Sequence, residues 1–182
     1  MSILITGGAR SGKSTFAEKL TMTLAARAVY IATGQAFDQE MEERIALHQL
    51  QRSESDYSWE TIEEPLHLAS LLDGLSGGRT VLVDCLTLWL SNLLLSVEKD
   101  KNRQEIIERE ISLLEQSVMS FNGNLIMVTN EVGNGIVPEY SLGRLYRDLA
   151  GRMNQRLARQ CNQVFLVTAG IPIELKTREY IL

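Results

Sequence analysis

The chain has 182 residues, of which 45% are hydrophobic, and a formal net charge of -5. This length and composition suit one soluble globular domain, 1–182, with a sizeable core. The negative charge excludes a strong general attraction to nucleic acid or anionic membranes, so any phosphate site has to be built locally. The N-terminus lacks a signal-peptide pattern and no apolar run could cross a bilayer, so we expect a cytoplasmic protein.

Short β-like runs alternate with longer helical patterns along the chain, and no repeat or linker divides them. Strands that alternate with helices predict a mainly parallel sheet with helices on both faces. Strands are predicted at 2–6, 28–32, 59–62, 80–83, 125–128 and 164–168, and helices at 13–27, 37–51, 65–72, 86–95, 104–121 and 141–161.

The first predicted strand runs into a segment that matches the phosphate-loop pattern G-x-x-x-x-G-K-[ST] in full. Glycines let the backbone curl so that N–H groups point at phosphate oxygens, and the next helix adds its positive N-terminus. Lys13 can reach the terminal phosphates of ATP or GTP, and the Ser14 hydroxyl can bind Mg²⁺. We therefore predict a three-layer α/β fold of the P-loop NTPase (RecA-like) type. The segment consists of Gly7, Gly8, Ala9, Arg10, Ser11, Gly12, Lys13 and Ser14.

Asp84 follows the apolar run 81–83 at the end of a predicted strand. In P-loop folds an acidic residue at this position lies beside the phosphate loop and holds the metal or its waters. The alternative is that Asp84 caps the helix starting near Leu86, and both roles can coexist. We predict that Asp84 and Ser14 bind Mg²⁺.

Two segments narrow the class of P-loop protein. Switch GTPases carry Asn-Lys-x-Asp and Asp-x-x-Gly motifs, but 130–133 reads Asn-Glu-Val-Gly and 84–87 reads Asp-Cys-Leu-Thr. A regulatory GTPase is therefore disfavoured, and a small-molecule kinase or nucleotidyltransferase is favoured. Cys85 and Cys161 lie far apart in apolar surroundings, so we predict buried free thiols rather than a disulfide or metal site.

More specific motifs run through the rest of the chain. The two most specific are Thr-Asn-Glu-Val-Gly-x-Gly-Ile-Val-Pro at 129–138 and Arg-Asp-x-Ala-Gly-Arg-x-Asn-Gln at 147–155. Others are Tyr-Ile-Ala-Thr at 30–33, Glu-Met-x-x-Arg-Ile-x-x-His at 40–48 and Trp-x-Thr-x-Glu at 59–63. With these motifs the chain resembles the bifunctional adenosylcobinamide kinase/adenosylcobinamide-phosphate guanylyltransferase family of cobalamin biosynthesis.

The resemblance implies two reactions. ATP or GTP phosphorylates the aminopropanol hydroxyl of adenosylcobinamide, and GMP then moves from GTP onto that phosphate to give adenosylcobinamide-GDP. The transfer runs through a GMP-histidine intermediate, and the histidine corresponds to His48. The family is described as oligomeric, which implies a homotrimer. The implied nucleotide contacts are Gly7 to Ser14, Ala32, Thr33, Gly34, Gln49, Leu50, Gln51, Arg52, Glu63 and Asp84.

His48 allows two interpretations on the residues alone. A lone histidine on the apolar stripe of a helix, near its C-terminus, is more often a packed or capping residue. A neutral imidazole is also the group that covalent nucleotidyl transfer needs to attack the α-phosphorus. The resemblance favours the nucleophile, and His67 has no supporting context. The family usually has a basic residue after its histidine, where this chain has Gln49.

Two further segments are candidate ligand contacts. Five arginines recur at helical spacing over 144–159, either as a salt-bridged face with Asp148 or as phosphate contacts, which we prefer only for Arg147 and Arg152. No aromatic residues interleave with them, so nucleic acid is not predicted. The segment 130–135 follows a predicted strand, where α/β sheets bind ligands. It is either an ordinary turn or, as we prefer, a contact for cobinamide or the phosphoryl acceptor.

Two other functions remain open from the sequence. A small-metabolite P-loop kinase without guanylyl transfer would form no covalent GMP adduct. A non-catalytic nucleotide-binding regulator would bind GTP without turning over any cobinamide acceptor.

Overall fold

The computed structural model describes residues 1–36, 39, 43, 46–47, 50, 52, 55–75 and 77–180. Its strands are β1 (Ser2–Thr6), β2 (Arg27–Ala32), β3 (Ser58–Glu63), β4 (Arg79–Asp84), β5 (Gly123–Val128), β6 (Gln163–Thr168) and β7 (Ile171–Glu174). Its helices are α1 (Lys13–Leu24), α3 (Leu68–Gly74), α4 (Leu86–Ser96), α5 (Arg103–Ser120) and α6 (Ser141–Gln160), and a 3₁₀ turn, Lys176–Arg178, follows β7.

The described strands form one sheet in the order β3-β2-β4-β5-β1-β6-β7. Strands β1 to β6 pair in parallel, which confirms the predicted sheet type. β7 pairs antiparallel with β6 and was not predicted. It is short and contains Pro172, which lacks an N–H and suits only an edge strand. Because the parallel strands all end at one edge, the loops after β1, β2, β4 and β5 meet there.

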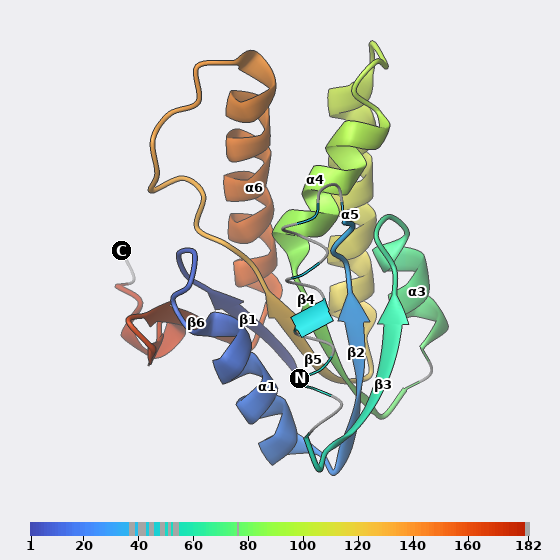
Figure 1. Cartoon of the computed structure of the whole chain (residues 1–182), viewed down its shortest axis with the longest axis vertical. Helices are drawn as coiled ribbons and strands as arrows, with labels where there is room; N and C mark the ends of the chain where they lie inside the picture. Colours follow the sequence, from blue (N-terminus) through green and yellow to red (C-terminus); the bar gives the residue numbers. More distant parts are fainter. Residues whose placement is uncertain are drawn as a thin grey trace.

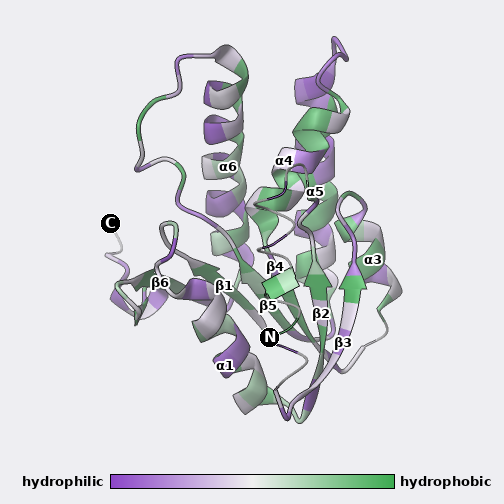
Figure 2. Ribbon diagram, in the orientation of Figure 1, coloured by the Kyte–Doolittle hydropathy of each residue, from purple (hydrophilic) through white to green (hydrophobic). Residues whose placement is uncertain are grey.

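Helices cover both faces of the sheet (Figure 1). α1 packs on one face, where Ile3, Ile5 and Ile126 belong to its buried cluster. The other helices pack on the opposite face, around a larger cluster that includes Trp89 and Leu114. The central strands and α4 are largely hydrophobic, whereas α5 and α6 also carry many hydrophilic residues (Figure 2). These layers confirm the predicted three-layer α/β fold.

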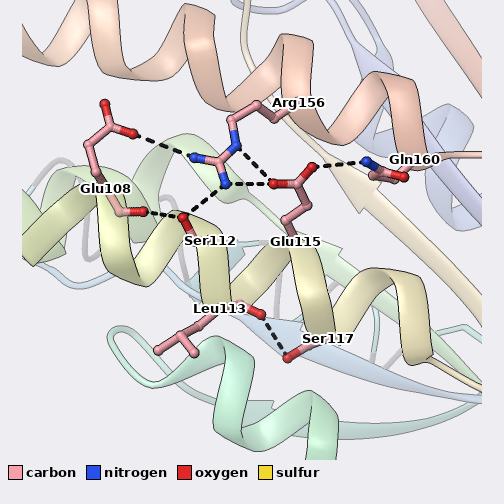
Figure 3. Close-up of polar contacts among 7 residues, drawn as sticks. All are labelled: Glu108, Ser112, Leu113, Glu115, Ser117, Arg156 and Gln160. Atoms are coloured by element: carbon pink, nitrogen blue, oxygen red, sulfur yellow. Dashed lines mark hydrogen bonds and ion pairs between the residues drawn. The ribbon is translucent and has the colours of Figure 1, made fainter.

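A polar contact joins α5 to α6 (Figure 3). The Arg156 guanidinium donates to the Glu115 carboxylate, with its Nε at 2.9 Å, and also pairs with Glu108 at 3.5 Å. Gln160 donates to the other Glu115 oxygen at 2.9 Å. These hydrogen bonds lower the pKa of Glu115, the one from Arg156 most strongly. The polar contact therefore fixes how the two longest helices sit against each other.

Two helices, α1 and α3, differ from the sequence prediction by more than one residue at an end. α1 ends before its predicted limit because Ala25 adopts an extended backbone and Arg27 already begins β2. α3 begins at Leu68 rather than at 65 because the Glu64 carboxylate accepts the two preceding N–H groups and forms a turn. The helix predicted at 37–51 lies largely outside the described residues. No described helix is both long and apolar enough to cross a membrane.

Candidate active site

The phosphate loop, Gly7–Ser14, joins the carboxyl end of β1 to the start of α1. Arg10 and Gly12 have positive φ angles of 56° and 93°. This left-handed backbone curls the loop, so that successive N–H groups can face an anion. Gly12 is the N-cap of α1 and has no side chain to satisfy the first N–H groups of the helix. The loop therefore has the shape and polarity of an anion site at a helix N-terminus.

Backbone contacts hold this curvature in place. A Cβ atom on Gly7 would lie 2.4 Å from the Val167 carbonyl oxygen, so no side chain fits there. Gly12 faces Gly170 of the β6–β7 turn, and a Cβ on Gly12 would lie 3.2 Å from the Gly170 Cα. The Gly170 N–H also donates to the Ser11 carbonyl at 2.8 Å. The loop is thus packed directly against the end of β6.

A cation and a carboxylate flank the point where the loop leaves β1. Lys13 is 8% exposed, and its ammonium donates to the Gly8 carbonyl at 3.1 Å. The Glu131 N–H donates to the Gly7 carbonyl at 3.1 Å. The Glu131 carboxylate accepts a 2.5 Å hydrogen bond from the Thr6 hydroxyl. The segment after β5 is therefore attached to the phosphate loop itself.

The strand order separates Asp84 from the loop by one further strand. Val128 of β5 is in register with Asp84 on one side and Ile5 on the other. Because adjacent strands lie roughly 4.8 Å apart, the Asp84 backbone lies about 10 Å from that of Ile5. This spacing leaves room for phosphate and metal between Asp84 and the loop. The sequence predicted Asp84 beside the loop, whereas the structure attaches Glu131 to it directly.

Tyr30 orients the Asp84 carboxylate. Its hydroxyl donates to Asp84 Oδ2 at 3.2 Å. Burial, followed by the Asp84 charge, raises the pKa of Tyr30, so the phenol stays neutral and remains a donor. The N-cap of α4 is Cys85, so the alternative prediction that Asp84 caps this helix is wrong.

Arg52 lies against the other side of Tyr30. Its guanidinium carbon is 3.7 Å from the Tyr30 ring centroid, a cation–π contact, and the side chain is 8% exposed. Trp59 meets the same ring edge-on at 5.7 Å. Both Arg52 Nε and Trp59 Nε1 are buried without a hydrogen-bond partner in the described part of the chain. A cavity of about 600 Å³ lies here, lined by Arg52, Ser55, Tyr57, Ser58, Trp59, Thr61 and Glu63.

Unpaired buried donors are costly, which makes this cavity a candidate ligand site. A third charge also lies close by. Burial raises the pKa of Glu18 on α1, the Asp84 charge raises it further, and the Arg52 charge lowers it. Glu18 and Asp84 are therefore two carboxylates in the neighbourhood of one guanidinium. No sequence pattern identified Glu18.

A buried polar network fixes the strand ends beneath the site. The Thr33 hydroxyl accepts from the Cys85 N–H at 2.9 Å and donates to the Cys85 carbonyl at 2.7 Å. Asn130 donates to the Thr87 hydroxyl at 2.8 Å, and the Tyr146 hydroxyl donates to the Thr87 carbonyl at 3.0 Å. The network links the ends of β2, β4 and β5 to α6, so these loops form one rigid edge.

The two cysteines have no role in this chemistry. Both Cys85 and Cys161 are buried and free, as the sequence predicted. Burial raises the pKa of each thiol to about 11. Both therefore stay protonated near neutral pH and are poor nucleophiles.

The arginines of α6 divide into two groups. Arg144 donates to the Pro138 carbonyl at 3.1 Å, and Arg147 donates to the Gly133 carbonyl, so both brace the segment after β5. Arg152 pairs with Glu108 on α5 at 3.4 Å. The ion pairs of this helix thus reach α5, and the prediction that Arg147 and Arg152 contact phosphate stays a prediction.

The braced segment presents apolar side chains to solvent. Ile136 is 96% exposed, Val137 is 57% exposed and Tyr140 is 68% exposed. The segment runs from the carboxyl end of β5 to the start of α6 (Figure 1). It therefore places exposed apolar side chains a few residues along the chain from Glu131, which is attached to the phosphate loop.

Similarity to known proteins identifies the family of this chain. A family model described as "Cobinamide kinase / cobinamide phosphate guanyltransferase" matches residues 3–175. The chain belongs to this family. It is therefore an enzyme with cobinamide kinase and cobinamide-phosphate guanylyltransferase activities.

Relatives of similar length support the assignment. The chain is 44% identical over 177 residues to the bifunctional adenosylcobalamin biosynthesis protein CobP of Pseudomonas aeruginosa, which covers 97% of this chain and 98% of that protein. It is 42% identical over 185 residues to the bifunctional adenosylcobalamin biosynthesis protein CobU of Escherichia coli, covering 97% and 100%.

Solved structures match the fold at low sequence identity. A type III secretion system ATPase superposes with a TM-score of 0.52 at 13% identity, covering all of this chain and 58% of that protein. A Pyrococcus horikoshii protein superposes with a TM-score of 0.53 at 9% identity, covering 95% and 84%. At these identities the likeness concerns the fold alone.

The family resemblance implied a set of nucleotide contacts. Most of those that the structure describes lie at or just after the carboxyl ends of the strands. Thr33 is fully buried after β2, and Gly34 follows it. Glu63 ends β3 and lines the cavity with Arg52, whereas Leu50 is 53% exposed. Three predicted residues lie outside the described part of the chain, so their roles stay predictions: His48, Gln49 and Gln51.

Sequence analysis assigned no specific role to three side chains of the candidate active site. Tyr30 was noticed only as part of a motif. Nothing in the sequence indicated that its strand pairs with β4, and so the hydrogen bond to Asp84 was not predicted. Glu131 was noted within a candidate loop but received no chemical role. Thr6, which donates to Glu131, was interpreted only as the end of a strand.

Proposed function

We propose that one phosphate loop, Gly7–Ser14, serves both reactions of this enzyme, with a different flank of the loop used for each. The observation that carries the proposal is the unequal chemistry of the two flanks. Toward β5, Glu131 and Lys13 are bonded to the first peptides of the loop. Toward β2 and β3, Arg52 and Trp59 line a cavity, and each keeps a buried donor without a partner among the described residues.

In the kinase step, the loop holds the triphosphate of ATP or GTP. Lys13 and the N–H groups at the start of α1 bind the phosphate oxygens. Ser14 and Asp84 hold Mg²⁺, and their hard oxygen donors fit this ion, which needs few protein ligands beside phosphate and water. The Tyr30 hydrogen bond supports this role because it fixes the Asp84 carboxylate. When bound, Mg²⁺ neutralises charge on the phosphates.

In the transfer step, His48 is the nucleophile. Its imidazole attacks the α-phosphorus of GTP, a nitrogen–phosphorus bond forms, and pyrophosphate leaves. An oxygen of adenosylcobinamide phosphate then attacks the same phosphorus and regenerates the histidine. Arg52 stands four residues after His48 in the sequence. Its buried, unpaired Nε supports a contact to the guanine nucleotide in the adjoining cavity.

The acceptor occupies the segment after β5. A cobinamide carries a large, partly apolar macrocycle on which the reacting hydroxyl is only a small group. The exposed side chains of Ile136 and Val137 offer it an apolar surface, continuous with Glu131 at the phosphate loop. We further propose that residues 1–182 act as one cytoplasmic domain and assemble as a homotrimer.

The test supplies adenosylcobinamide, GTP and Mg²⁺ and measures adenosylcobinamide-GDP by mass spectrometry. A parallel incubation with labelled GTP measures the protein–GMP adduct. We expect both products in the native chain, loss of the adduct in His48→Ala, and retention in His67→Ala, since His67 is exposed at the start of α3. An adduct that persists in His48→Ala would refute the assigned nucleophile, and a native chain without one would favour a kinase alone.

A further inference from the structure

We infer that Glu131 is the general base of the kinase step, which accepts the proton of the acceptor hydroxyl. The inference deepens the proposed function and rests on it. It concerns a carboxylate that no sequence pattern assigned and that belongs to the segment after β5. Its basis is the attachment of this residue to the phosphate loop.

Glu131 and Lys13 are held by neighbouring peptide units. The Glu131 N–H binds the Gly7 carbonyl, and the Lys13 ammonium binds the Gly8 carbonyl, each at 3.1 Å. Consecutive Cα atoms lie about 3.8 Å apart, so the tip of the Lys13 side chain and the Glu131 backbone are bonded to adjacent parts of the loop. Any phosphate that reaches Lys13 is therefore close to the backbone of Glu131.

The Glu131 carboxylate is half-buried and oriented. Oε1 accepts the Thr6 hydroxyl at 2.5 Å, and Thr6 is itself 6% exposed. Within the described part of the chain, Oε2 receives no hydrogen bond. One oxygen thus anchors the group, while the other is left to accept a proton from a substrate.

The strand order distributes two tasks over two carboxylates. Asp84 lies one strand further from β1 and is bound by Tyr30, which suits a ligand to the metal. Glu131 lies on the same segment as the exposed Ile136 and Val137, which face the acceptor in the proposed function. A base has to reach the acceptor hydroxyl close to the terminal phosphate, and Glu131 adjoins both the phosphate loop and the segment that the proposed function assigns to the acceptor.

The kinase step transfers one proton to Glu131 and one phosphoryl group to the acceptor. The acceptor O–H bond breaks, and its proton moves to Glu131 Oε2. The acceptor oxygen forms a bond to the γ-phosphorus of ATP, and the bond from that phosphorus to the β-phosphate oxygen breaks. ADP leaves, and the carboxylic acid returns its proton to water.

The test compares Glu131→Gln with Thr6→Val. Glutamine keeps the size of the side chain and can still accept the Thr6 hydrogen bond, but it cannot take a proton at neutral pH. We expect kcat for phosphorylation of adenosylcobinamide by ATP to fall about 100-fold in Glu131→Gln. Formation of the GMP adduct from GTP, and the Mg²⁺ concentration for half-maximal activity, should stay within threefold of native. Thr6→Val should lose less than tenfold in kcat.

Four outcomes overturn the inference. Kinase activity within threefold of native in Glu131→Gln would show that no base acts here. An equal loss in Thr6→Val would indicate that Glu131 only braces the loop. A large rise in the Mg²⁺ requirement would make it a metal-side residue, and an equal loss of the GMP adduct would make it part of general nucleotide binding. A native chain that phosphorylates no cobinamide refutes the proposed function instead, so the two failures are distinguishable.

Discussion

The two flanks of the phosphate loop differ in how far their polar groups are satisfied. Toward β5, Glu131 and Lys13 are hydrogen-bonded to the loop itself. Toward β2 and β3, Arg52 and Trp59 keep buried donors without partners beside a cavity. The first flank is attached to the loop by hydrogen bonds that need no ligand, whereas the second keeps buried N–H donors that no described group satisfies. This difference suggests that the kinase geometry is preformed and that the transferase geometry is completed by its nucleotide.

The largest effect is expected at Lys13, which the proposed function uses in both reactions. Lys13→Ala should reduce both phosphorylation and guanylyl transfer about 1,000-fold, because both reactions place phosphates on this ammonium. Steady-state assays with adenosylcobinamide and with its phosphate measure the two rates. Lys19→Ala, an exposed position on the same helix, is the matched control. If one reaction survives in Lys13→Ala, the two reactions do not share the loop.

Arg52→Gln tests the incomplete flank alone. We expect GMP-adduct formation to fall about 100-fold, since a charge-assisted contact in a buried site is lost. Phosphorylation with ATP should change less than threefold. Arg159→Gln, which alters an exposed arginine at the end of α6, should change neither. Equal losses of both activities in Arg52→Gln would contradict a division between the flanks.

Ile136→Ser tests whether the acceptor covers the segment after β5. Burying one isoleucine contributes roughly 1.5–3 kcal/mol, so KM for adenosylcobinamide should rise about tenfold or more while kcat changes little. The GMP adduct, which needs no acceptor, should form at the native rate. Met119→Ser, which removes another exposed hydrophobic side chain on α5, is the control. An unchanged KM would remove Ile136 from the acceptor site.

Tyr30 contacts both Asp84 and Arg52, so two substitutions separate its roles. Tyr30→Phe keeps the ring beneath Arg52 but removes the hydrogen bond to Asp84, which is worth about 1 kcal/mol. We expect the Mg²⁺ requirement to rise about fivefold with normal adduct formation at saturating Mg²⁺. Tyr30→Leu should also impair the adduct. Identical behaviour of the two variants would show that the ring beneath Arg52 does not matter, and a native Mg²⁺ requirement in Tyr30→Phe would show that the hydroxyl does not.

The α5–α6 contact is the control region and should have the smallest effect. Glu115→Gln should lower the free energy of unfolding by about 1 kcal/mol or less, measured by urea denaturation, and change neither activity. Hydrogen bonds from Arg156 lower the pKa of Glu115, so the pair stabilises the native state above the unfolded pKa of roughly 4.3. This stabilisation is lost as the pH falls through the lower folded value. A stability difference that persisted in strong acid would need another cause.

The fold could be predicted from local sequence patterns, because most helices and strands have a recognisable pattern of hydrophobic residues. Alternating strands and helices predicted the parallel sheet, and the phosphate-loop motif predicted its site residues from Gly7 to Ser14 with the correct flanking elements. The short β7 escaped prediction because a single proline obscured an edge strand. Local patterns suffice where the structure is decided within a few neighbouring residues.

The candidate site depended on strand order, which local patterns do not contain. Nothing in the sequence states that β5 lies between β1 and β4, so the closeness of Glu131 to the phosphate loop was invisible. Glu18 joins Arg52 and Asp84 only because α1 packs across the sheet. The family resemblance supplied His48, which no residue pattern could have distinguished from a packed histidine.

The insertion of β5 between the loop strand and the Asp84 strand also bears on how specificity can evolve. The connection from Gly133 to Tyr140 is attached at both ends to rigid elements and clipped to α6 by Arg144 and Arg147. Among the described residues, its exposed side chains make no contact that holds Lys13 or the N–H groups of the phosphate loop, so we expect that they can be substituted without altering those donors. Redesign of substrate specificity could therefore begin in this connection, with the phosphate loop left unchanged.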